Sequence, residues 1–407
     1  MNTNDTMNIA VYTLTSELHD EHAVAAVTKE FLTNLGFDHE LRGADYDDYG
    51  THSLDLIYVR TGGTEGIFRR LLPQLQQQSS RPFFLLTSGK SNSLAASLEI
   101  LSYLRQQKLN GEVIHGSETY IRHRVELLAR VGEIRRQLQG ARLGVVGAPS
   151  DWLISSYADY QIVARRLGVK LVDVPIEELI DIIGQTPLHE TTESSPSAAI
   201  RASLPGAQQI YEALKKVVAQ HHLNGLTLRC FDLLTAVRNT GCLALAKLNS
   251  EGVVAGCEGD VPTLLSMMLA QAMTGVSGFQ ANPSRINPET GELLFAHCTI
   301  PLNMVEHYEF DTHFESGIGV GIRGYMKEGP VTLFKVAGDL SRCFIAEGQL
   351  VRNQAQADLC RTQQIIQLDD KRLASYFLTE PIGNHHVIIP GHVGEALGAL
   401  FAEINYI

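Results

Sequence analysis

Residues 54–60 read LDLIYVR, and the sequence GGTEGIFRRLLPQL follows at 62–75. The first stretch is an almost continuous apolar run. The second begins with two glycines and then carries apolar residues at helical spacing. The pattern recurs where PFFLLT (82–87) precedes SNSLAASLEILSYLRQQ (91–107). Apolar strands that alternate with helices are typical of a parallel sheet covered on both faces.

Segments of the same kind lie on either side of this pair. An apolar strand is expected at Met7–Leu14 and a helix at Glu21–Leu35, while a long helix at Glu118–Gly140 leads out of the region. Together these segments predict a first Rossmann-like α/β domain over residues 1–140.

The pattern restarts at Arg142. RLGVVG (142–147) predicts a strand and residues 150–168 predict a helix, with further strands expected in VKLVDV, LTLRCF and GVVAGCEG and a further helix at Val261–Thr274. These segments predict a second α/β domain over residues 141–275. The polar stretch at 184–206 fits a surface loop, a lid or a partly helical excursion.

From about residue 276 the spacing of the apolar runs changes. Apolar runs now come about every ten residues, separated by Gly, Pro and Asn, as in FQA, ELLFAHCTI, GIGVGI, PVTLFKVAG and RCFIAEG. This spacing predicts an antiparallel β domain, a barrel or a sandwich, over residues 276–407, with a closing helix at Val393–Ile404.

Composition and charge exclude several classes of protein. The 407-residue chain has 33 Lys and Arg against 45 Asp and Glu, so its net charge is −12, which argues against nucleic-acid partners. We expect no membrane-spanning segment, because no apolar run reaches about 18 residues. The N-terminus also lacks the pattern of a signal peptide. Six cysteines without a CxxC pair are typical of reduced thiols, and we expect a cytoplasmic protein.

Carboxylates follow the expected strand GVVAGCEG. A side chain at the carboxyl end of a strand in an open α/β sheet points into the crevice where ligands bind. Asp260 has a structural explanation as the N-cap of the next helix, with Pro262 in the first turn. Glu258 has no such role, and an apolar, glycine-flanked carboxylate needs a counter-charge or a metal ion.

Two further segments carry imidazoles. His297 lies in the apolar run ELLFAHCTI, where a core histidine bonded to a backbone carbonyl is the simpler interpretation. Asn384, His385 and His386 open the strand HHVIIP. Adjacent side chains on a strand point to opposite faces, so at most one of the two histidines can face a given site.

These segments resemble the L-fucose/L-arabinose isomerase superfamily. The resemblance rests on GCLALAKLNSEGVVAGCEGD, LLSMMLAQAMTG, AHCTIP and GNHHVIIPGH, and in the N-terminal part on TGGTEG, SNSLAASLEIL and GVVGAPSDWLISS. It covers nearly the whole chain and is closest to the shorter fucose-isomerase-like proteins. It implies two Rossmann-like α/β domains without nucleotide binding, followed by a C-terminal antiparallel β-barrel-like domain.

The resemblance also implies chemistry. Such enzymes interconvert aldoses and ketoses, here a pentose or a 6-deoxyhexose, through an enediol with a divalent metal, usually Mn²⁺. Matched by motif, the metal ligands are Glu258, His297 and His386, or its neighbour His385. Asp260, His385 and Asn384 are the expected substrate-binding residues. The N-terminal loops of such proteins reach the active site of an adjacent subunit, which implies a homotrimer or homohexamer.

The chain departs from this family at one position. Where family members have a second metal carboxylate, 24 places after Glu258, this sequence has Asn282, which we take as a candidate catalytic position. An amide can ligate a cation weakly but cannot act as a general base. Two functions therefore stay open: an isomerase whose acid/base partner is Asp260, Glu315 or a histidine, or a non-catalytic or divergent carbohydrate-binding relative that keeps the pocket.

Overall fold

The computed structural model describes residues 8–190 and 193–405, which fall into two compact units. The first unit comprises Met1–Gln137 together with Ala399–Ile407, and the second comprises Leu138–Gly398. Met7, the expected start of the first strand, and two residues of the polar stretch, Thr191 and Thr192, lie outside the described residues. Within the described residues, no helix combines the length and apolarity needed to cross a membrane.

The first unit is built on a parallel sheet with the strand order β2-β1-β3-β4-β5. Its strands are β1 (Ile9–Leu14), β2 (Glu40–Gly43), β3 (Leu54–Val59), β4 (Phe83–Leu86) and β5 (Gly111–Ile114). Its helices are α1 (Glu21–Leu35), α2 (Glu65–Gln78), α3 (Ser93–Gln106) and α4 (Glu118–Leu138). β1 and β3 are mostly apolar and are buried at every position, so both of their faces are covered.

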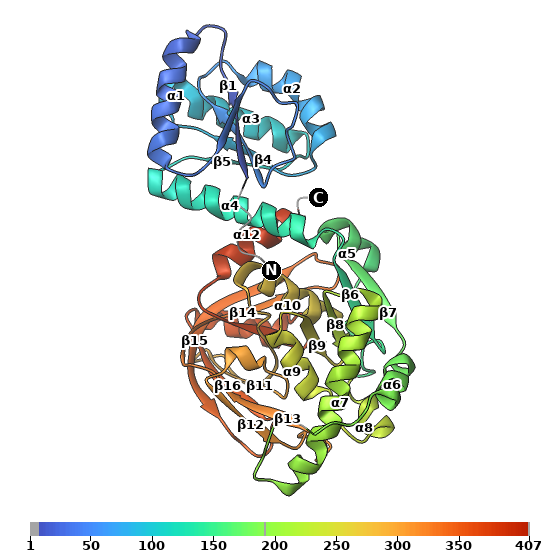
Figure 1. The fold of residues 1–407 in the computed structure, drawn as a ribbon. Coiled ribbons are helices and arrows are strands. Elements are labelled where there is room, and N and C mark those ends of the chain that lie inside the picture. Colours follow the sequence, from blue (N-terminus) through green and yellow to red (C-terminus); the bar gives the residue numbers. More distant parts are fainter. Residues whose placement is uncertain (1–7, 191–192, 406–407) are drawn as a thin grey trace. The chain divides into compact units, whose positions relative to one another are not determined.

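Helices supply that cover on both sides of the sheet. Leu32 of α1 and Val125 of α4 belong to one core cluster with Val11 and Leu56. Residues of α2 and α3, among them Phe68 and Ile100, pack with the opposite face (Figure 1). The unit is therefore a doubly wound α/β layer structure.

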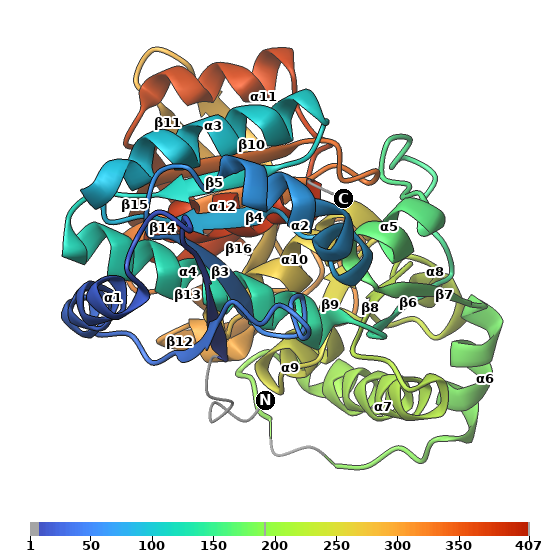
Figure 2. The ribbon, with the colours of Figure 1, turned by 90° about the horizontal axis from the view of Figure 1, so that it is seen from above.

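The second unit begins with a parallel sheet of order β7-β6-β8-β9. Its strands are β6 (Arg142–Val146), β7 (Lys170–Val174), β8 (Gly225–Leu228) and β9 (Val254–Cys257). The accompanying helices are α5 (Tyr160–Leu167), α6 (Ile176–Gln185), α7 (Ala198–His221), α8 (Asp232–Ala236), α9 (Cys242–Ser250) and α10 (Val261–Thr274). Figure 2 shows α6 and α7 beside this sheet, and their apolar residues share its core.

A closed antiparallel barrel with the order β10-β11-β16-β15-β14-β17 completes this unit. Its strands are β10 (Phe279–Asn287), β11 (Glu292–His297), β14 (Gly329–Val336), β15 (Cys343–Gln354), β16 (Thr362–Leu368) and β17 (His386–Pro390). A separate pair is formed by β12 (His307–Asp311) and β13 (Gly321–Tyr325). Helix α11 (Tyr376–Thr379) also belongs to this unit, whereas α12 (Gly394–Asn405) begins in it and continues into the residues of the first unit.

The fold class predicted from the sequence is confirmed: two parallel α/β regions precede an antiparallel barrel. The division into three domains stays a prediction, and the second α/β region and the barrel belong to one compact unit. Helix α10 has the expected bounds, with Asp260 as its N-cap and Gly275 in the left-handed conformation at its C-cap.

Of two local expectations, one is corrected and the other, which had stayed open, is decided. The helix predicted over 150–168 begins only at Tyr160, because the Asp159 side chain accepts hydrogen bonds from the backbone N–H groups of Gln161 and Ile162 and so fixes the start of the helix. Residues 150–159 are instead a loop. The polar stretch is partly helical, because α7 starts at Ala198 with Ser197 as its N-cap.

Candidate metal centre

Glu258 stands on strained backbone at the end of β9. Its φ is 64° and that of Gly259 is 72°, so two successive residues are left-handed. Only glycine adopts this conformation without cost, and a Cβ on Gly259 would also lie 2.2 Å from the carbonyl oxygen of Ala148. A non-glycine residue held in this region is typical of functional sites.

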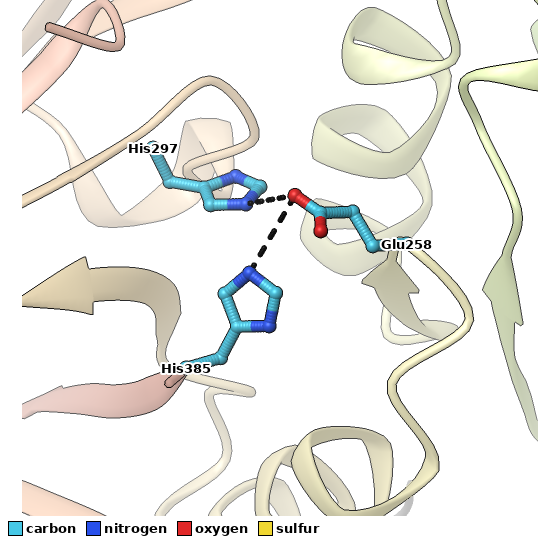
Figure 3. Close-up of side chains that lie close together, drawn as sticks. All are labelled: Glu258, His297 and His385. Atoms are coloured by element: carbon cyan, nitrogen blue, oxygen red, sulfur yellow. Dashed lines mark ion pairs between the residues drawn. The ribbon is translucent and has the colours of Figure 1, made fainter. Parts of the chain in front are cut away.

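Two histidines approach Glu258 from the barrel. His297 is the last residue of β11, and His385 comes directly before β17. The Nε2 atom of each lies 3.6 Å from Glu258 Oε1, and Figure 3 shows both rings pointing toward this oxygen. The exposed fractions are 8% for Glu258, 4% for His297 and 0% for His385. The fold thus brings a carboxylate and two imidazoles together in a buried group.

The far nitrogen of each imidazole is also fixed. Nδ1 of His385 is 2.9 Å from Oδ2 of Asp260, and Nδ1 of His297 is 3.0 Å from Oγ1 of Thr299. Asp260 in turn pairs with the buried Lys335, whose Nζ lies 3.3 Å from Oδ1. Histidines that ligate metals are commonly oriented by a second hydrogen bond of this kind, often to a carboxylate.

The charges of the group are strongly coupled. Burial opposes ionisation of Glu258, but His385 and His297 outweigh it and hold the pKa of this carboxyl far below its usual range. Burial also opposes a proton on His385, yet Glu258 and Asp260 raise its pKa to about 9. The pKa of His297 is lowered, mainly by burial. Near neutral pH a proton on His385 therefore balances the carboxylates, and a bound cation would replace it.

The group can hold a divalent cation. Nε2 of His385 is buried without a hydrogen-bond partner, and one ligand atom from each of Glu258, His297 and His385 lies within 4.8 Å of the others. One carboxylate oxygen and two imidazole nitrogens suit a hard or borderline ion such as Mn²⁺. Three protein ligands also leave coordination positions for a substrate.

A second group of ligand-type residues, Glu347, Asp369 and His392, is more exposed. Glu347 Oε1 already accepts the backbone N–H of Gly394 at the start of α12. Exposed carboxylates that cap helices occur commonly without an ion, so this group is the weaker candidate.

His386 lies apart from this group, although motif matching had favoured it over His385 as the ligand. Its Nε2 is 3.0 Å from the Tyr376 hydroxyl and its Nδ1 is 3.0 Å from the Asn384 carbonyl. Its ring packs against Phe377. Because His386 pairs with Ala281 across the barrel wall, it faces the barrel interior while His385 faces Glu258.

The other expected residues lie around the group. Asp260 contacts His385, as described. Asn384 Nδ2 donates to Asn282 Oδ1 at 3.0 Å, and Asn384 Oδ1 accepts the backbone N–H of His385 at 2.8 Å. Asn384 is exposed and Asn282 is half-buried. The two amides thus form a pair one residue away from the candidate ligand His385.

Two residues that contact Glu258 or Asp260 were not predicted from the sequence. Trp152 Nε1 donates to Glu258 Oε2 at 2.7 Å from the loop that had been expected to be helical. The only signal was that Trp152 is the single tryptophan of the chain. The second is Lys335, which pairs with Asp260 and which the alternation of the strand PVTLFKVAG did not distinguish from a surface lysine.

An aromatic row extends from this tryptophan. The Trp152 ring meets the edge of Phe231 at 4.7 Å between centroids, and Phe231 meets His313 at 5.2 Å. Burial, with a smaller contribution from His297, lowers the pKa of His313 to about 4. Trp152 is 52% exposed, so it presents an aromatic surface beside a buried carboxylate.

The known proteins that this chain resembles in sequence are sugar isomerases. No protein-family model matches the chain. It is 24% identical over 233 residues to a sulfoquinovose isomerase of Alkalicoccus urumqiensis, covering 54% of this chain and 53% of the relative. A sulfoquinovose isomerase of a Clostridium species is 23% identical over 313 residues, covering 70% and 67%. One of Priestia aryabhattai is 22% identical over 262 residues, covering 60% and 59%.

The chain therefore spans between about half and two thirds of the length of the curated relatives it matches. The similarity agrees with the coarser part of the sequence-based expectation, that of a sugar isomerase.

The environment of His386 predicts a pH dependence of stability. Burial lowers its pKa from 6.5 to about 3, so the folded protein keeps this imidazole neutral while the unfolded chain protonates it. Between pH 6.5 and about 3 the unfolded state binds more protons than the folded state, so the free energy of unfolding decreases as the pH falls. This group contributes up to about 1.4 kcal/mol per pH unit in that range. Above pH 6.5 it has no effect on the free energy of unfolding.

Denaturant unfolding of the wild type and of His386→Gln at pH 7, 6, 5 and 4 measures this contribution. The wild type should lose more stability over the series than the variant. Parallel losses in the two proteins would contradict a buried neutral His386.

Proposed function

We propose that the protein is a divalent-metal-dependent aldose–ketose isomerase that acts on a sugar through an enediol, as the fucose/arabinose isomerase superfamily does. The observation that carries the proposal is the buried group of Glu258, His297 and His385, in which the Nε2 atom of His385 has no hydrogen-bond partner. The names of the relatives support the reaction type, because each is a sulfoquinovose isomerase.

Glu258, His297 and His385 are the proposed ligands, with Mn²⁺ as the preferred ion. A cation held there would supply Lewis-acid polarisation of the substrate carbonyl and stabilise the negative charge that develops on its oxygen. Trp152 holds the second oxygen of Glu258, so the carboxylate has little freedom to rotate. Asp260 orients the His385 ring in the same way.

Isomerisation also needs a group that moves a proton between C1 and C2. Asp260 is a poor candidate, because Lys335 and His385 occupy its oxygens and hold its pKa below the usual range against the effect of burial. Glu315, on the loop between β12 and β13, has a pKa raised by burial and then by the charge of Glu258. A carboxyl with a raised pKa is suited to accept and return a proton, so Glu315 is the proposed partner of Glu258.

The amide pair of Asn282 and Asn384 is proposed to bind sugar hydroxyl groups. Both amides combine donors and acceptors, and Asn384 is exposed next to His385. In this proposal Asn282 acts in positioning the sugar at the catalytic site rather than as a base.

The proposed substrate is a pentose or a 6-deoxyhexose, and sulfoquinovose enters the same panel because it is the substrate named for the relatives. A second candidate function is a non-catalytic or divergent carbohydrate-binding protein. Asn282 favours this alternative, because an amide stands where the family has its second metal carboxylate.

We further propose a cytoplasmic homotrimer or homohexamer with no nucleic-acid or membrane partner. The loops at Thr61–Glu65 and Ser91–Ser93, after β3 and β4, are the segments expected to reach a neighbouring subunit. The six cysteines are free thiols, which supports a reducing compartment.

Isomerase activity is tested by incubating metal-loaded protein with single pentoses, 6-deoxyhexoses and sulfoquinovose and following aldose–ketose conversion by NMR. At least one sugar should be converted, with activity lost on chelation and restored by Mn²⁺. The control is Glu258→Gln, which should be inactive at every metal concentration. Sugar binding without conversion of any aldose would instead support the carbohydrate-binding alternative.

Metal binding should separate the two adjacent histidines. Glu258→Gln and His385→Gln should each weaken Mn²⁺ binding by at least about tenfold, because each loses a ligand, whereas His386→Gln should keep wild-type affinity. Affinity should also rise with pH up to about 9, because the ion displaces the His385 proton. Calorimetric titration of the folded variants measures this. Loss of binding in His386→Gln with retention in His385→Gln would refute the assignment.

Replacing Asn282 with the carboxylate that the family has at this position distinguishes the two functions, because they predict different effects of added Mn²⁺ on the melting temperature of the variant. In a metal enzyme, Asn282→Asp adds a charged oxygen and should tighten Mn²⁺ binding, so thermal stabilisation by Mn²⁺ should grow. In a metal-free binding protein the new charge near Glu258 should only lower the melting temperature, without recovery on adding Mn²⁺. Asn384→Asp, which places the same charge on the other amide of the pair, is measured in parallel. Melting curves with and without Mn²⁺ separate the outcomes.

A further inference from the structure

The first unit contains a cavity of about 440 Å³ that the proposed isomerase chemistry does not use. Thr13, Leu14 and Thr15 at the end of β1 line it, together with Arg60, which directly follows β3. It therefore lies at the carboxyl ends of two neighbouring parallel strands. Its volume falls in the range of small-molecule sites.

The topology makes this position a crevice. In the order β2-β1-β3-β4-β5, the connection from β1 passes through α1 on one face of the sheet, and the connection from β3 passes through α2 on the other. The direction of winding thus reverses between β1 and β3. In open α/β sheets ligands bind at such a switch point, outside the carboxyl ends of the strands.

The cavity contains a buried guanidinium. The Arg60 side chain is 7% exposed, its Nε donates to Thr15 Oγ1 at 2.6 Å, and its Nη2 lies 2.7 Å from both carboxylate oxygens of Glu21. Arg60 and Glu21 are the only charged residues among the described residues that line the cavity. The remaining wall is mostly apolar, with Ala25, Leu41 and Ile67.

Glu21 is a replaceable partner for this arginine. A buried guanidinium needs an anion, which Glu21 supplies from the first turn of α1. However, the Glu21 side chain is 63% exposed, so it can leave for water at little cost. A ligand oxyanion would recover the same charge-assisted hydrogen bonds on Arg60 while its body fills the cavity.

We propose that this cavity binds a small organic anion, a carboxylate or phosphate on a partly apolar body, and that the oxyanion takes the place of Glu21 on Arg60. The residues of this cavity belong to the first unit and those of the proposed metal centre to the second, and the proposal does not depend on the isomerase function.

Calorimetric titration of the full chain tests the proposal with 3-hydroxybutyrate as the carboxylate probe, glycerol 3-phosphate as the phosphate probe and glycerol as the neutral control. At least one anion should bind to a single site and glycerol should not. Glu21→Gln should tighten binding by about fivefold, because it removes the internal competitor. Arg60→Gln should weaken binding at least about tenfold.

The matched control is Glu112→Gln, which breaks a comparable bidentate pair, with Arg124, away from the cavity. It should leave anion affinity unchanged, as should Glu258→Gln, which separates this site from the metal centre. Failure of both anions to bind the wild type and Glu21→Gln would overturn the proposal, as would equal binding by folded Arg60→Gln. If Arg60→Gln does not fold, the anion affinities of Glu21→Gln and Glu112→Gln are compared instead. Equal anion affinities of these two variants would overturn the proposal.

Discussion

The buried chain of charges from Lys335 through Asp260 and His385 to Glu258 is the interaction on which the candidate site depends. Asp260 has two tasks: Oδ1 accepts the backbone N–H of Thr263 at 2.8 Å and caps α10, while Oδ2 faces Nδ1 of His385 at 2.9 Å. An unpaired carboxylate at 0% exposure would be costly, and the equally buried Lys335 offsets it. The start of a helix and the orientation of a ligand imidazole are thus fixed by one side chain.

The parallel sheet and the barrel meet at this chain of charges within the second unit. Glu258 directly follows β9, whereas His297 ends β11 and His385 directly precedes β17. Gln280 of β10 joins the two layers, since its Oε1 accepts the backbone N–H of Cys257 at 2.8 Å and its Nε2 donates to the Cys257 carbonyl at 3.2 Å. The residue before Glu258 is therefore held in place by a strand of the barrel.

Much of this arrangement is predictable from the sequence, because strong local signals carry it. The N-cap residue Asp260 and the apolar run after it predict helix α10. The apolar, glycine-flanked setting of Glu258 predicts that this carboxylate needs a counter-charge or a metal ion. Alternation shows that His385 and His386 face opposite sides, but only the register of β17 against β10 decides which side faces Glu258. Strand β16 (TQQIIQL) was not predicted, because three glutamines in seven residues are typical of a polar loop. In the structure Gln363 is buried, and its Nε2 donates to the backbone carbonyls of Gln356 and Cys360. The contact of Trp152 with Glu258 joins residues 106 positions apart, so no local pattern reports it.

The most direct test of the metal centre is a crystal structure of the protein grown with Mn²⁺, with anomalous scattering recorded at the manganese absorption edge. One strong anomalous peak is expected within bonding distance of a Glu258 carboxylate oxygen and the Nε2 atoms of His297 and His385, with His386 still hydrogen-bonded to Tyr376. A peak at Glu347, Asp369 and His392 with none beside Glu258 would contradict it.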